Sequence, residues 1–144
     1  MKYQVGKVGR VVAARFEGGE DILENIEEIA RREQIRCAVF NVIGGVKKGR
    51  IVVGPEDETL PPKPVWRDIG ESTEVVGVGT IFWHDGEPKI HLHGAFGKRD
   101  TVKVGCLRGS SETFLVLEVI IIELDGLTAV RALDEKTGMV LLTL

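Results

Sequence analysis

The sequence has little net charge, few cysteines and histidines, and no long apolar run. Its 19 Lys and Arg residues are outnumbered by 22 Asp and Glu residues, so the formal net charge is −3. A protein that grips nucleic acid through its phosphates normally carries the opposite balance. The longest apolar stretch, FLVLEVIII at residues 114–122, contains Glu118 and is too short to cross a bilayer. We therefore expect neither a membrane anchor nor an independent binder of nucleic acid.

The two cysteines, Cys37 and Cys106, are too few for a disulfide scaffold. The first ten residues, MKYQVGKVGR, lack the apolar segment of a secretory signal. We therefore expect a cytoplasmic protein in which both thiols are free. The chain has 144 residues and no shift in composition, so it is predicted to form a single domain over residues 1–144.

One segment has the apolar period of an amphipathic helix. It is GGEDILENIEEIARREQI, residues 18–35. Asp21 followed by Glu24 resembles a capping box, and Arg31 and Arg32 suit the negative end of the helix dipole. Its apolar residues recur at helical spacing and form one stripe. They are Ile22, Leu23, Ile26, Ile29 and Ala30.

Most of the remaining chain has the composition and turn spacing of β-strands. Asp-Gly pairs at residues 85–86 and 125–126 are typical of tight turns, and the proline-rich segment 55–64 is predicted to be a loop. The sequence therefore predicts an α+β fold, a mostly antiparallel sheet with one main amphipathic helix. The predicted strands are residues 3–16, 35–45, 50–54, 73–83, 88–96, 101–107, 113–124, 127–133 and 139–144.

The apolar run at residues 114–122 carries more apolar surface than one sheet and one helix can bury. Its residues are apolar at odd and even positions alike, so both faces of this strand should be covered. One helix covers only one face of a sheet. The remaining surface must be hidden by the sheet closing on itself or by another subunit, and we expect a homo-oligomer.

The segment KIHLHGAFGKRDTVKVGC, residues 89–106, holds two of the three histidines and one of the two cysteines. His91 and His93 are two residues apart, so they leave the same face of a strand. If Lys98 and Arg99 form the turn that follows, His91 lies opposite Cys106. If Arg99 and Asp100 form it, His93 lies opposite Cys106. A three-residue turn would instead send Cys106 to the other face, so the turn decides the geometry.

Two imidazoles and a thiolate are ligands that zinc prefers, and three protein ligands leave a fourth position for water or a small molecule. The sequence therefore indicates a metal site at His91, His93 and Cys106, with zinc as the expected ion. The alternative is an ordinary strand on which both rings are hydrated and the cysteine is packed in the core. Cys37 lies in an apolar strand and is expected to be a core residue. His84 is expected to be a turn residue outside the site.

Four motifs in this order resemble the plants and prokaryotes conserved (PPC) domain, in its prokaryotic, stand-alone form. They are RFEGGEDILENIEEIARREQIRCAVFNVIGGV, KIHLHGAFG, VKVGCLRGS and EVIIIEL, and the similarity runs over residues 15–133. The resemblance implies an antiparallel sheet flanked by a main helix and assembled as a homotrimer. Prokaryotic members of the family show a His-x-His pair and a further histidine, which match His91, His93 and the position of Cys106. The exchange of histidine for cysteine keeps a zinc ligand at that position.

The family resemblance also implies a link to DNA, which this sequence supports only weakly. In plants the domain follows a basic AT-hook, but this chain has no Arg-Gly-Arg-Pro segment, and it has GESTEVVGVG where plant members carry their partner-binding motif. Three hypotheses follow. The first is a metal-binding homotrimer, with no catalytic residue assigned. The second is a DNA-associated regulator that acts through DNA or a protein partner. The third is a module that binds a small ligand at subunit interfaces, where Gly44 and Gly45 would shape the pocket.

Overall fold

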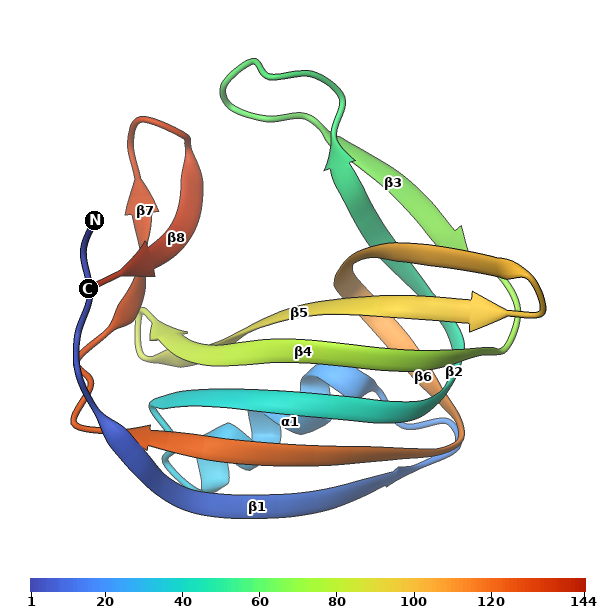
Figure 1. Ribbon diagram of the computed structural model, residues 1–144, viewed down its shortest axis with the longest axis horizontal. Helices are drawn as coiled ribbons and strands as arrows, with labels where there is room; N and C mark the ends of the chain where they lie inside the picture. Colours follow the sequence, from blue (N-terminus) through green and yellow to red (C-terminus); the bar gives the residue numbers. More distant parts are fainter.

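The computed structural model describes all residues 1–144 and contains one helix and eight strands, all drawn in Figure 1. The helix is α1 (Ile22–Arg32), which lies between the first two strands. The strands are β1 (Lys7–Glu17), β2 (Cys37–Pro55), β3 (Pro64–Ile69), β4 (Thr73–His84), β5 (Glu87–Lys98), β6 (Thr101–Asp125), β7 (Val130–Asp134) and β8 (Met139–Thr143).

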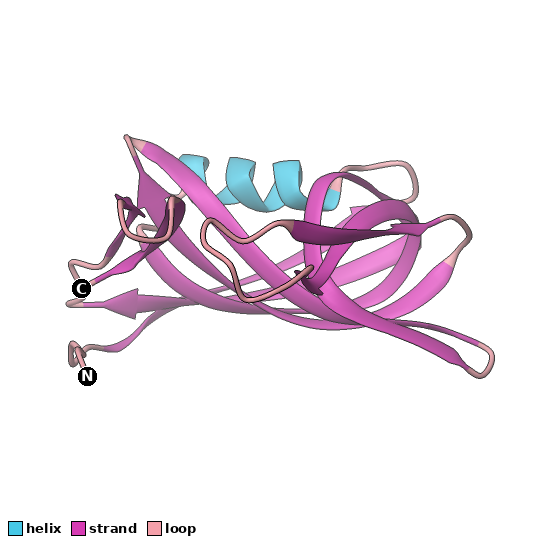
Figure 2. Cartoon of the chain, turned by 90° about the horizontal axis from the view of Figure 1, so that it is seen from above, coloured by secondary structure: helices cyan, strands magenta, loops and turns pink.

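Six strands form one antiparallel sheet that curls until it meets itself. Its order is β1-β6-β5-β4-β2-β3, and β6 also pairs with β2. The strands β2, β4, β5 and β6 therefore form a closed ring of hydrogen-bonded neighbours. Figure 2 shows the strongly bent strands beneath the helix. The prediction of a mostly antiparallel α+β fold with one main helix is confirmed.

The predicted helix forms, and its sequence explains both its ends and its packing. The carboxylate of Asp21 accepts hydrogen bonds from the backbone N–H groups of Leu23 and Glu24, each 3.0 Å long. Ile22, Ile26 and Ala30 are buried and join the main core with the inward side chains of the sheet. With only 11 residues and many charged side chains, α1 lacks the length and apolarity of a membrane-spanning helix.

Two strands are longer than the sequence predicted. The segments 35–45 and 50–54 belong to the single strand β2, and the segments 101–107 and 113–124 belong to β6. Gly44 does not end a strand. It has a φ of 137°, and a Cβ atom there would overlap the backbone oxygen of Val116 on β6. The glycine lets the two bent strands approach closely. The proline-rich loop forms, but Pro64 begins β3, a strand that the sequence did not reveal.

The face of the sheet that points away from α1, here called the outer face, carries many apolar side chains. On β6, Leu117, Val119 and Ile121 are fully buried, whereas Ile120 between them is 40% exposed. Within one chain, therefore, only one side of this strand is buried, although the sheet does close on itself. The exposed apolar residues of the outer face, each 40–66% exposed, are Val11, Ile43, Val76, Val78, Val102, Val104 and Ile120.

The last two strands form a separate hairpin that covers one end of the outer face. The strands β7 and β8 pair only with each other, and β7 contacts β4 (Figure 1). Just before β7, Ala129 packs against Cys37 and Phe82 in a small second core. The ring nitrogen Nδ1 of His84 lies 2.9 Å from the carbonyl oxygen of Arg131, which ties the hairpin to the end of β4.

Candidate metal centre

The structure brings His91, His93 and Cys106 together on the outer face. His93 on β5 lies directly opposite Cys106 on β6, because Arg99 and Asp100 form the turn between these strands. This is the second of the two registers that the sequence allowed. His91 leaves the same face of β5 two residues earlier, so all three side chains converge.

The donor atoms have nearly the spacing of a tetrahedral metal site. The Nε2 atoms of His91 and His93 are 3.1 Å apart, and their rings meet edge to face at 78°. Two nitrogens bound to one tetrahedral zinc ion are about 3.3 Å apart, given zinc–nitrogen bonds of about 2.0–2.1 Å. All donor atoms of the three residues lie within 4.8 Å of one another.

Burial shifts the ionisation of His91 and Cys106. Burial is the largest cause, and together with the nearby charges of Arg131 and Arg108 it lowers the pKa of His91 to about 4. Burial also raises the pKa of the Cys106 thiol, while the same two arginines oppose that rise. In the absence of an ion, His91 is therefore neutral at pH 7 with its Nε2 atom hydrogen-bonded to that of His93, and Cys106 is held as a thiol. A bound divalent cation would favour both the neutral imidazole and the thiolate.

No carboxylate joins this cluster. Two acidic residues near the cluster in sequence are bound elsewhere: Glu87 pairs with Arg31, and Glu112 pairs with Lys47 and Lys48. Three protein donors, two nitrogens and one sulfur, are therefore all that the chain offers an ion here. The arrangement has no neighbouring general base, so it offers a candidate metal site and no assigned catalytic residue.

The other cysteine and histidine lie outside the cluster, as the sequence indicated. Cys37 is 2% exposed and belongs to the small core beneath the C-terminal hairpin, where burial raises the pKa of its thiol. His84 contacts the backbone of Arg131 and lies 3.4 Å from Asp85. Both residues serve as matched controls for the cluster.

Sequence reasoning missed two arginines beside the cluster. Arg131, from the C-terminal hairpin, is only 9% exposed and donates a hydrogen bond of 3.1 Å to Thr80, which lies opposite His91. Arg108 lies two residues beyond Cys106 on the same face of β6. A charged residue within the apolar segment LTAVRAL was the one available signal, since a buried arginine normally has a specific partner.

The most basic run of the chain is already engaged by acidic side chains. Lys47 and Lys48 lie 2.6 and 2.7 Å from the carboxylate oxygens of Glu112. Arg50 pairs with Asp68 at 3.2 Å and stacks over the ring of Trp66. This run is therefore no free basic patch for phosphates.

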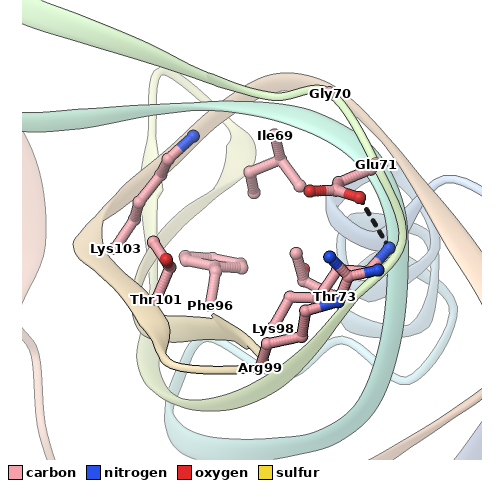
Figure 3. A pocket seen from close by; sticks show the side chains of 9 residues that line it. All are labelled: Ile69, Gly70, Glu71, Thr73, Phe96, Lys98, Arg99, Thr101 and Lys103. Atoms are coloured by element: carbon pink, nitrogen blue, oxygen red, sulfur yellow. Dashed lines mark ion pairs between the residues drawn. The ribbon is translucent and has the colours of Figure 1, made fainter.

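A separate cavity of about 210 Å³ lies near the turn between β5 and β6 and contains none of the three cluster residues (Figure 3). Its charged residues are partly engaged, since Lys98 pairs with Glu71 at 2.7 Å and Lys103 donates to the backbone oxygen of Asp68. Gly44 and Gly45 do not line this cavity. They serve the close packing of β2 against β6.

Fold and site together define an α+β protein with a curled antiparallel sheet and a histidine-cysteine cluster on its outer face. A sequence profile described as the Plants and Prokaryotes Conserved (PCC) domain matches residues 3–125. The chain belongs to this family, whose name is also shortened to PPC. No curated protein sequence matches the chain.

Solved structures agree with this assignment. The metal-containing protein AF0104 from Archaeoglobus fulgidus is 30% identical, with a TM-score of 0.86 and 98% of each chain covered. A PPC protein from Pyrococcus horikoshii is 27% identical, with a TM-score of 0.85 and coverage of 98% of this chain and 96% of that one. A protein from Ralstonia eutropha JMP134, provisionally described as DNA-binding, is 24% identical over 92% and 90% of the two chains, with a TM-score of 0.76. At that identity the likeness concerns the fold alone.

Proposed function

We propose that this protein binds one transition metal ion per chain, with zinc as the preferred ion, through His91, His93 and Cys106. The observation that carries the proposal is the convergence of three donor side chains, with two ring nitrogens 3.1 Å apart. Two nitrogens and one sulfur suit zinc, and a fourth position would remain for water or a small ligand. The description of the Archaeoglobus relative as metal-containing supports the presence of an ion on this fold.

Elemental analysis of protein purified without an affinity tag tests the proposal. About one metal per chain is expected, and Cys106→Ala and His93→Ala should each lower that content strongly. Cys37→Ala and His84→Ala are the matched controls, because they remove the same residue types outside the cluster. The proposal fails if the wild-type protein retains no metal, or if the control variants lose as much metal as the cluster variants.

We further propose that the chain assembles as a homotrimer through the outer face. Seven exposed apolar side chains on one face exceed the scattered apolar residues normal for a monomer surface. The number of three subunits comes from the family resemblance. Light scattering at micromolar concentration should give three times the mass of one chain, which is 15.8 kDa.

A charge placed within the outer face should prevent this assembly. Val78 is 55% exposed at the centre of the face, so Val78→Asp should give monomers. Val53, which is 41% exposed near the end of β2 and outside this patch, provides the control Val53→Asp. A wild-type monomer, or an intact trimer of Val78→Asp, would rule out this interface.

DNA association remains the second candidate function, supported by the provisional descriptions of two distant relatives. The net charge of −3 and the ion-paired basic run oppose direct binding. Titration of the protein into a labelled duplex at several salt concentrations separates the two candidates. A salt-dependent shift of the duplex would favour DNA association, whereas metal content without any shift favours the metal-binding function.

A further inference from the structure

Two arginines that lack an acidic partner face one cavity beside the histidine-cysteine cluster. Neither Arg108 nor Arg131 forms an ion pair, whereas five of the ten arginines of the chain do. Both line a cavity of about 240 Å³, together with Lys89 and His91.

Arg131 is the most unusual of these residues. It is only 9% exposed, and the one hydrogen bond of its side chain runs from an Nη atom to Thr80. Its Nε–H is buried and has no partner. A buried cation without a compensating charge is strongly unfavourable, so proteins pair such groups or supply them with a bound counter-ion.

Arg108 increases this need for negative charge. Its guanidinium lies near enough to Arg131 to lower the pKa of Arg131, in addition to the larger effect of burial. The groups that line the cavity from β5, β6, β7 and β8 include three basic residues and His91, and no acidic residue. Its apolar wall is formed by Ile90, Met139, Val140 and Leu141. Charge and shape therefore match a small molecule with an anionic end and an apolar body.

We propose that this cavity binds a small oxyanion group, a carboxylate or a phosphate, between the guanidinium groups of Arg108 and Arg131. The planar guanidinium with its parallel N–H donors suits both kinds of oxyanion. The free Nε–H of Arg131 supplies one donor. This site goes beyond the metal centre, because its binding residues are different ones, and either site can fail while the other stands. His91 lines the cavity and belongs to the cluster, so the bound anion lies beside the metal centre.

Calorimetric titration tests this proposal with inorganic phosphate in one arm and acetate in the other. Both are run on metal-loaded and on chelator-treated wild-type protein. Saturable binding of at least one of the two anions is expected, and the comparison of arms identifies the preferred group. Arg131→Gln and Arg108→Gln should each weaken binding about ten-fold or more, because each removes charge-assisted hydrogen bonds.

The matched control is Arg67→Gln, which removes the same charge from an exposed arginine that has no ion pair. It should leave anion binding unchanged. Arg108 is only partly buried, so Arg108→Gln keeps the test decisive if Arg131→Gln fails to fold. Thermal unfolding of each variant identifies any that is not folded.

The outcomes separate the anion site from the metal centre. If Cys106→Ala loses the metal but still binds the anion, the anion site stands on its own. If the arginine variants keep their metal and lose the anion, the proposal is supported. It is overturned if wild-type protein binds neither anion, if the arginine variants bind as tightly as Arg67→Gln, or if the anion binds only with metal present and with no dependence on the arginines.

Discussion

The two cysteines allow a sharp test of the metal centre through its coupling to stability. Cys106 and Cys37 are 5% and 2% exposed, so each change to Ala removes one buried sulfur from a packed site. Without metal, the two variants should each lose a similar amount of unfolding free energy, about 1 kcal/mol. Any larger difference between the variants must then come from a ligand that binds only one of the two sites.

A metal ion that binds only the folded protein would add stability that grows with the logarithm of its free concentration relative to the dissociation constant. Free metal at 100 to 1,000 times the dissociation constant contributes about 2.7–4.1 kcal/mol. For a chain of this size 1 kcal/mol corresponds to roughly 2–4 °C, so chelation should lower Tm by roughly 5–16 °C. Cys37→Ala should retain this chelator-dependent difference, whereas Cys106→Ala should lose most of it.

The assay is thermal unfolding followed by circular dichroism at one fixed protein concentration, with added zinc or with chelator. A fixed concentration is needed because assembly also contributes to Tm. Equal chelator effects in Cys37→Ala and Cys106→Ala would refute the assignment of Cys106 as a ligand. If the wild-type Tm is the same with chelator as with added zinc, metal binding is not coupled to folding.

Three further predictions concern the fold around the site. Gly79→Ala should lower the unfolding free energy by about 1–3 kcal/mol in urea titrations, because the added Cβ would overlap the ring of the fully buried Phe40; an unchanged midpoint would contradict this packing. Metal-free protein should lose stability as the pH falls from about 6.5 to 4. The reason is that folding lowers the pKa of His91, so the unfolded chain takes up its proton first. In the presence of chelator, His91→Gln should reduce this dependence of stability on pH. Asp21→Ala should cost about 1–2 kcal/mol, because the carboxylate caps α1 and also accepts the N–H of Ser111 at 2.7 Å; Asp21→Asn should recover much of the loss.

Local patterns predicted the helix and the hairpin turns, because the forces that form them act within a few residues. The apolar stripe of α1 and its Asp21 cap lie within one segment, and Asp85 and Gly86 carry the positive φ values that their turn requires. The continuity of β2 past Gly44 could not be predicted in this way. A glycine pair suits either a strand end or a close contact, and only the position of β6 decides between them.

The candidate site likewise combines features that local sequence determines with features that only distant contacts determine. The spacing of His91 and His93 placed their side chains on one face, but the turn at Arg99 and Asp100 determined where Cys106 lies. Arg131 could not be placed from sequence at all. Its segment reaches the site only because the C-terminal hairpin folds back over the start of β2 and the end of β4.

The C-terminal hairpin is bonded to itself rather than to the six-stranded sheet, and it lies beyond residue 125, where the match to the family profile ends. Its length and sequence can therefore vary without breaking a single ladder of the main sheet. An engineer could therefore exchange the C-terminal hairpin for another and keep the histidine-cysteine cluster. Such an exchange would change the lining of the neighbouring cavity, to which the hairpin contributes Arg131.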